Sequence, residues 1–100
     1  VHRTALKGPE AGVTALTNVF SGRPARGMFN RLMRELGPMH AEAPAFPLAT
    51  AAIAPLRAHF EAQGSGDCSP LWAGQNAGGC RSLPAAEITH QLARGFECSL

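Results

Sequence analysis

The chain is organised around one stretch, Ser69-Pro70-Leu71-Trp72-Ala73-Gly74-Gln75-Asn76-Ala77-Gly78-Gly79. It contains the single tryptophan of the chain, followed at once by small residues and by two amide side chains. Glycine lets a backbone approach another group closely because it has no Cβ atom. Tryptophan anchors such an approach by burying a large apolar surface. The stretch therefore predicts a turn that brings its main chain close to something flat or anionic, with helices supporting it.

The composition limits the kinds of protein that this can be. One hundred residues allow a single domain, and only 16% of them are charged, below the roughly 25% typical of soluble domains. A surface so poor in charge favours a piece of a larger protein over a free-standing module. The net charge of +2 is too small to indicate a nucleic-acid partner.

Targeting signals are missing from the sequence as it stands. It opens with Val1 rather than methionine, no apolar signal segment follows, and no apolar run approaches the roughly 20 residues of a membrane helix. We therefore expect a fragment of a soluble, cytoplasmic protein that does not bind membranes.

The first half of the chain predicts a helix, a strand and a second helix. Residues 1–7 resemble the end of a helix that Gly8-Pro9 stops, and the β-branched residues of 13–20 favour a short strand. Residues 20–27 are expected to turn into a helix, with Pro24 in its first position. That helix has an apolar stripe at helical spacing, made of Met28, Phe29, Leu32, Met33 and Leu36, and should end at Gly37-Pro38.

The second half predicts two longer helices joined by flexible chain. After a connector over residues 39–46, Pro47 should open a helix that runs to about Gln63, with Pro55 kinking or splitting it. Its expected inner stripe is Leu48, Ala52, Leu56, His59 and Phe60. Residues 64–67 form a tether, residues 74–81 suggest a short helix, and the last helix follows Pro84. The inward face of that last helix is predicted to be Ala85, Ile88, Leu92 and Phe96. The fold class is mainly α with one or two short strands.

No set of residues in the sequence assembles a catalytic or metal site. The histidines are not at metal-ligand spacing, and the cysteines form no C-x-x-C pair; these residues are His2, His40, His59, His90, Cys68, Cys80 and Cys98. Cys80 follows two glycines, but no base lies near it in sequence to activate it. We assign no catalytic and no metal-binding residue.

Two arginines leave an alternative open. Arg23 and Arg26 flank the predicted N-terminus of a helix, where the free N–H groups favour an anion. The alternative is structural, with the two side chains pairing with carboxylates of a neighbouring segment or fixing the turn.

Two blocks of sequence together resemble a known family. The first is Phe20-Ser21-Gly22-Arg23-Pro24-Ala25-Arg26-Gly27, followed by Asn30-Arg31. The second is Ser69-Pro70-Leu71-Trp72-Ala73-Gly74-Gln75. In this order, with an alanine-rich helix between them, they resemble the C-terminal portion of a nitronate monooxygenase, a family formerly called 2-nitropropane dioxygenase. The resemblance covers nearly the whole chain, from about His2 to Phe96.

The resemblance implies an FMN-dependent (β/α)8 barrel with a small substrate domain, which oxidises alkyl nitronates with dioxygen. Residues 1–68 would belong to the substrate-covering domain. Residues 69–100 would return to the barrel with a flavin-side turn and a C-terminal helix. The resemblance also places Trp72, Ala73, Gly74 and Gln75 against the FMN and substrate pocket, with contact through the backbone at Ala73, where some members have a hydroxyl.

The family's catalytic histidine and phosphate-binding loops match no residue here, because they belong to the barrel strands that precede this segment. The expected partners are a nitronate, dioxygen and the missing N-terminal barrel portion, and the isolated segment should be inactive. Two alternatives stay open: a small helical protein-interaction module without catalysis, and an enoyl reductase of the same barrel superfamily, which the first block disfavours.

Overall fold

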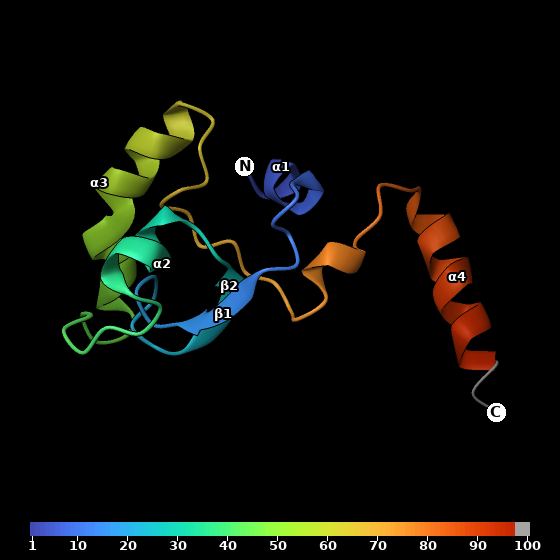
Figure 1. Cartoon of the computed structure of the whole chain (residues 1–100), viewed down its shortest axis with the longest axis horizontal. Coiled ribbons are helices and arrows are strands. Elements are labelled where there is room, and N and C mark those ends of the chain that lie inside the picture. Colours follow the sequence, from blue (N-terminus) through green and yellow to red (C-terminus); the bar gives the residue numbers. More distant parts are fainter. Residues whose placement is uncertain (98–100) are drawn as a thin grey trace.

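The structure is a computed structural model that describes residues 1–97, so Cys98 lies outside the described residues. It is mainly helical with two short strands, as the sequence predicted (Figure 1). In chain order the elements are α1 (His2–Lys7), β1 (Thr14–Thr17), β2 (Ala25–Met28), α2 (Arg31–Leu36), α3 (Leu48–Ala62), the 3-10 helix η1 (Ala77–Gly79) and α4 (Ala85–Glu97).

The two strands form an antiparallel hairpin that the Trp72 stretch extends. Thr14 lies opposite Met28, and Thr17 lies opposite Ala25. On the other side of β2, Trp72 forms a bridge with Gly27. The Met28 N–H donates to the Leu71 carbonyl at 2.8 Å, and the Ala73 N–H donates to the Arg26 carbonyl at 3.2 Å. The stretch therefore begins as extended chain along β2 before it turns.

The prediction that residues 20–27 lead into a helix was wrong, because Ala25–Met28 is β2. The backbone groups of these residues find partners on both sides, in β1 and in residues 71–73. The helix begins only at Arg31, where the side chain of Asn30 accepts a hydrogen bond from the Met33 N–H. Asparagine is among the preferred residues at this cap position. The predicted end at Gly37 is confirmed, with Gly37 at φ +78°.

Two hydrophobic clusters form the core. One consists of Val19, Phe20, Leu32, Met33 and Cys68; the other consists of Ala11, Met28, Leu71 and Ala77. Because side chains alternate along extended chain, Leu71 and Trp72 point to opposite sides of the hairpin. Leu71 joins the second cluster, whereas Trp72 lies next to Phe20 of the first.

Helix α3 runs unbroken through Pro55, so the predicted split does not occur. Its inner face is also displaced from the prediction. Ala49 is fully buried, and Ile53 and Phe60 pack against the first cluster, whereas Leu48 and Leu56 are exposed. Phe60 alone of the predicted stripe faces inward. The small side chain of Ala49 allows the helix to approach closely, and the Thr50 hydroxyl donates to the Phe20 carbonyl at 3.1 Å.

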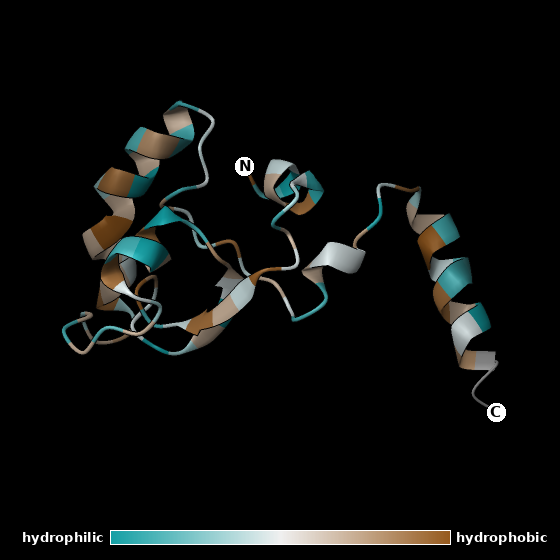
Figure 2. Ribbon diagram, viewed as in Figure 1, coloured by the Kyte–Doolittle hydropathy of each residue, from teal (hydrophilic) through white to brown (hydrophobic). Residues whose placement is uncertain are grey.

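Helix α4 stands away from the rest of the chain (Figure 1) and carries a stripe of apolar residues along its length (Figure 2). Leu92 is 71% exposed and Phe96 is 70% exposed, so the prediction that they face inward was wrong for this chain. Among residues 1–97, no helix has both the length and the apolar character needed to cross a bilayer.

Candidate functional site

The indole of Trp72 is held on one side and open on the other. Its ring lies edge-on to Phe20, with centroids 5.8 Å apart and an interplanar angle of 87°. A Cβ atom added to Gly27 would lie 3.4 Å from the indole Cε3 and 3.1 Å from the Leu71 carbonyl oxygen. The ring therefore packs directly over bare backbone, while Trp72 stays 43% exposed.

The residues after Trp72 form a short exposed rim. Ala73 is half-buried, whereas Gly74 and Gln75 are exposed, and a Cβ atom on Gly74 would meet nothing within 4 Å. Ala77, at the start of η1, is buried in the second cluster and anchors the far end of the rim. The four residues predicted to face the cofactor, 72–75, thus follow one another on a loop that is fixed at both ends.

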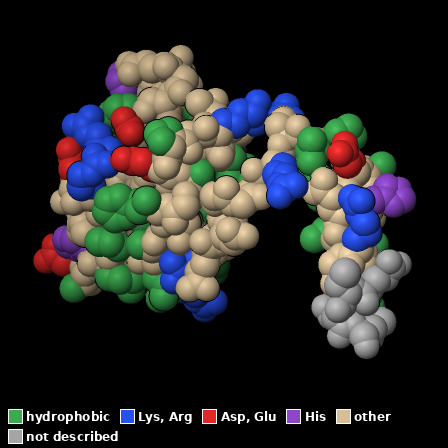
Figure 3. Space-filling model, turned by 45° about the vertical axis from the view of Figure 1, so that its right-hand side comes forward, with side chains coloured by type: hydrophobic (Ala, Val, Ile, Leu, Met, Phe, Trp, Pro, Cys, Tyr) green, Lys and Arg blue, Asp and Glu red, His purple; other side chains and the backbone are tan. Residues whose placement is uncertain are grey.

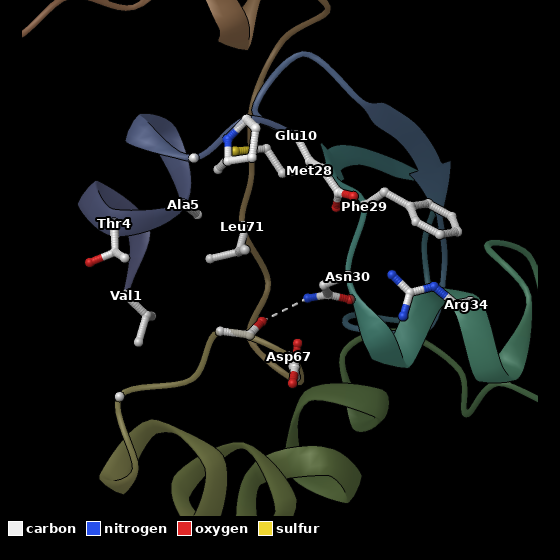
Figure 4. Close-up of a pocket in the computed structure, with 14 residues that line it drawn as sticks. Val1, Thr4, Ala5, Glu10, Met28, Phe29, Asn30, Arg34, Asp67 and Leu71 are labelled. Carbon is white, nitrogen blue, oxygen red and sulfur yellow. Dashed lines mark hydrogen bonds between the residues drawn. The ribbon is translucent and has the colours of Figure 1, made fainter.

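Asn30 holds the chain that leads into this loop. Its buried amide donates to the carbonyl of Gly66 at 2.9 Å (Figure 4). The same amide donates to the carbonyl of Ser69 at 2.8 Å, and the side-chain oxygen caps α2. The Leu32 N–H also donates to the Asp67 carbonyl at 3.0 Å. The predicted tether over 64–67 is therefore hydrogen-bonded to α2. In the sequence Asn30 stood out only as part of the first block that resembles the family; the signal for its role was the preference for asparagine at helix caps.

A second set of polar contacts joins α3 to the same point. The buried Ser69 hydroxyl donates to Glu61 Oε1 at 2.6 Å, and Arg57 Nε donates to the same oxygen at 2.7 Å. The hydrogen bond from Ser69, followed by that from Arg57, holds the pKa of the Glu61 carboxyl below its usual value. Glu61 therefore connects α3 to the residue three positions before Trp72.

The two arginines have structural roles in this chain. The Arg23 guanidinium stacks on the Phe46 ring, 4.5 Å from its centroid, and Arg26 Nη1 donates to the Thr14 hydroxyl at 3.0 Å. Neither lies at a helix N-terminus, because Arg23 precedes β2 and Arg26 lies within it. The predicted carboxylate partners are not found for either arginine among the described residues; an aromatic ring and a hydroxyl take their place.

The described histidines and cysteines do not gather into a site. His2 contacts the Pro70 carbonyl at 3.0 Å, His40 accepts from the Glu42 N–H, and His59 contacts Gln63. Within residues 1–97, no group of three histidine, cysteine, aspartate or glutamate side chains is arranged to hold a metal ion. Burial raises the pKa of the Cys68 thiol, which keeps it protonated and unreactive.

A cleft of about 310 Å³ lies on the other side of the hairpin, between α1 and the start of α2 (Figure 4). Met28 and Leu71 line its apolar part, and Glu10, Arg34 and Asp67 contribute mixed charges. Trp72 does not line it, since it points to the opposite side. The cleft is thus separate from the rim formed by residues 72–75.

Comparison with known proteins gives a consistent result. A family model described as nitronate monooxygenase matches residues 1–95. A nitronate monooxygenase of Pseudomonas aeruginosa is 42% identical over 92 residues, which cover 91% of this chain and 26% of that protein. The nitronate monooxygenase of Paraburkholderia phytofirmans is 41% identical over 101 residues, covering 99% of this chain and 27% of that protein.

A solved structure agrees with these relatives. The nitroalkane oxidase from Streptomyces ansochromogenes superposes with a TM-score of 0.79 at 40% identity, covering 93% of this chain and 26% of that one. The chain spans about a quarter of the length of the curated relatives that it matches.

Proposed function

This chain belongs to the nitronate monooxygenase family, and we propose that it is the C-terminal portion of an FMN-dependent enzyme that oxidises alkyl nitronates with dioxygen. The complete enzyme would be a (β/α)8 barrel whose catalytic histidine lies outside these residues. Membership of an oxidoreductase family favours this function over the helical interaction module and the enoyl reductase.

The observation that carries the proposal is the rim formed by Trp72, Ala73, Gly74 and Gln75. A partly exposed aromatic ring beside open backbone suits the flat face of a flavin. Gly74 has open space where a Cβ atom would be, so a ring system can approach its main chain. FMN would supply the electron transfer between nitronate and dioxygen when it is bound there.

The residues of this chain would bind and shield rather than react. Trp72 would present apolar surface that excludes water from the pocket, while Leu71, buried in the second cluster on the opposite side of the hairpin, would anchor the loop. The backbone N–H groups at Gly74 and Gln75, or the Gln75 amide, would donate hydrogen bonds to the bound cofactor. Phe20, Gly27 and Asn30 would keep this wall in place through the contacts described above.

The proposal assigns two parts of the chain to different parts of the enzyme. Residues 1–68 would belong to the substrate-covering domain, and residues 69–100 would return to the barrel. Hydrogen bonds cross this division, since Ser69 contacts both Asn30 and Glu61. The two parts would therefore form one rigid wall of the cofactor pocket. The partners would be a nitronate, dioxygen and the N-terminal barrel portion, in the cytoplasm, without nucleic acid or membrane.

The test compares two lengths of polypeptide. The 100-residue chain with FMN and a nitronate should give no turnover and no bound-flavin spectrum, whereas the polypeptide at its full encoded length should give both. Trp72→Ala in the longer protein should weaken flavin binding, and Gln63→Ala, at an exposed position after α3, serves as the control. Robust flavin-dependent turnover by the 100-residue chain alone would refute the fragment assignment.

A further inference from the structure

Two ion pairs have the same local geometry but different further contacts. In α2, Arg31 Nε lies 3.0 Å from Glu35 Oε1, four residues along the helix. In α3, Arg57 and Glu61 repeat this spacing at 2.7 Å. Figure 3 shows basic and acidic side chains close together on the side of the molecule that carries α2 and α3. A pair at this spacing adds little to stability by itself. Glu61 differs from Glu35 because it also accepts a hydrogen bond from Ser69, outside its own helix.

Ser69 is fixed by hydrogen bonds at all three of its polar groups, and its exposed fraction is 0%. The hydroxyl donates to Glu61 Oε1 at 2.6 Å, the carbonyl accepts from the Asn30 amide at 2.8 Å, and the N–H donates to the Gly66 carbonyl at 3.2 Å. Of these three bonds, the one from the hydroxyl is the one that reaches α3. Without the Glu61 carboxylate, a buried hydroxyl would lose its acceptor, which favours a displaced Ser69.

Little conformational freedom remains between Ser69 and Trp72. The φ angle of Pro70 is fixed by its ring. Leu71 is buried in the second cluster, and its carbonyl accepts from the Met28 N–H at 2.8 Å. A displacement of Ser69 would therefore tilt the extended segment that carries Trp72, because no freely rotating residue lies between them.

Arg57 fixes the direction of the Glu61 carboxylate. Its Nε donates to the same oxygen that accepts from Ser69, so α3 and the loop share one acceptor. The side chains of Arg57 and Glu61 are 38% and 32% exposed, which places the contact at the edge of the solvent. The hydrogen bonds from Ser69 and Arg57 lower the pKa of the Glu61 carboxyl, so it is ionised at neutral pH. An ionised acceptor forms a stronger hydrogen bond than a neutral one.

We propose that Glu61 is a positioning residue for the rim formed by residues 72–75. It would act through Ser69, which sets the direction in which the chain enters the rim, and it would touch neither cofactor nor substrate. By holding the rim in one orientation, its carboxylate would raise the affinity of the rim for FMN. The inference rests on the proposed function for the identity of the cofactor, whereas the effect on the indole of Trp72 does not depend on flavin.

The position of Trp72 can be measured without cofactor, in the polypeptide at its full encoded length. Fluorotryptophan gives one fluorine NMR resonance for each tryptophan, and the resonance that is lost in Trp72→Phe belongs to Trp72. Glu61→Ala and Ser69→Ala should each shift this resonance, because both release the loop from α3. The matched control Glu35→Ala, which breaks the ion pair of α2, should leave it in place. A Trp72 resonance that Glu61→Ala does not move overturns the proposal.

The affinity for FMN tests the consequence, at a temperature where circular dichroism shows every variant folded. Glu61→Ala should raise the Kd of FMN by about fivefold, the size expected for one lost hydrogen bond. Ser69→Ala should have a similar effect, and the double variant should bind no more weakly than either, because both changes remove one contact. Glu61→Gln retains an acceptor for the Ser69 hydroxyl and should keep most of the affinity. Equal losses in Glu61→Gln and Glu61→Ala, or additive losses in the double variant, overturn the action through Ser69.

The outcomes separate this proposal from the proposed function. A longer protein that binds FMN equally well in all these variants contradicts the positioning role alone. A longer protein whose Trp72 resonance moves as expected, but which binds no FMN, contradicts the proposed cofactor and confirms that Glu61 positions the rim.

Discussion

Helices α2 and α4 have the same kind of sequence pattern and opposite surroundings. Leu32 and Met33 of α2 are buried, with Met33 at 0% exposure, although the helix has only six residues and its last one, Leu36, is exposed. Those of α4 are mostly exposed along thirteen residues. A helix as short as α2 is not stable alone and depends on its cap and its packing. Periodicity therefore indicates which face of a helix is to be covered, but does not identify what covers it.

The largest expected contrast in stability is between shortening an apolar side chain of α2 and shortening one of α4. Met33→Ala should lower the free energy of unfolding by about 2 to 5 kcal/mol, because it leaves a cavity in a closed core. Leu92→Ala should change it by less than about 0.5 kcal/mol, because the side chain is already in water. Urea unfolding followed by circular dichroism measures both. An equal loss in the two variants would mean that α4 is covered in solution.

Removing a side-chain hydrogen bond should likewise lower stability at α2 and have little effect on stability at α4. Asn30→Ala removes the cap of α2 and leaves the carbonyls of Gly66 and Ser69 without their donor, so we expect a loss of about 2 kcal/mol. Thr89→Ala in α4 removes one exposed hydrogen bond to Ala85 and gains helix propensity, so stability should hold or rise slightly. Asn30→Ala should also shift the emission of Trp72, the single tryptophan of the chain. An unchanged spectrum would argue against Asn30 as a support of the rim.

Replacing a glycine with alanine should lower the stability at Gly27 and raise it at Gly95. In Gly27→Ala the new methyl group meets the Leu71 carbonyl at 3.1 Å and the Trp72 ring at 3.4 Å, so we expect a loss of about 1 kcal/mol and a changed Trp72 emission. In Gly95→Ala, within α4, the methyl group meets no described atom within 4 Å and favours the helix by about 0.5 kcal/mol. Thermal unfolding ranks the two variants. A stable Gly27→Ala protein with unchanged fluorescence would show that the strand and the indole adjust freely.

The smallest expected effect is a pH dependence of the free energy of unfolding. It arises where Glu61 of α3 contacts Ser69, and α4 takes no part in it. Because the folded pKa of Glu61 is lowered, its contribution is fully present above the unfolded value near 4.5 and is lost as the pH falls through the folded pKa. The stability difference between the protein and Glu61→Gln should therefore shrink as the pH falls from neutral to about 3. Ser69→Ala should reduce the same dependence, because Ser69 is the main cause of the shift. A difference that stays constant with pH would rule out this linkage.

Several elements were predictable because their signals are local. Residues 1–7, the helix after Pro47 and the helix after Pro84 were expected from glycine, proline and apolar spacing, and all three are present. Strand β2 was missed because its pairing with β1 and with residues 71–73 is not visible in residues 20–27 themselves, and residues 71–73 lie far along the chain. The face of α3 was misplaced by one position, because packing favoured the small Ala49 over the larger Leu48.

The candidate rim was chosen from sequence because Trp72 and the glycines after it are a local and conspicuous combination. The residues that hold the rim in place could not be identified from the sequence. Asn30 lies 36 residues from Gly66 and 39 from Ser69, and Glu61 reaches Ser69 from another helix. Hydrogen bonds over such separations depend on how the helices pack, which no local spacing encodes.

The amino-acid sequence by itself determined that the chain is mainly helical, that α2 ends at Gly37, and the family, since these depend on neighbouring residues and on two short blocks of sequence. Tertiary structure alone decided that residues 25–28 form a strand, that Trp72 and Leu71 serve opposite sides of it, and that the stripe of α4 is left uncovered. The physical reason is that backbone propensity and periodicity act over a few residues, whereas burial is a property of whatever other surface comes within reach.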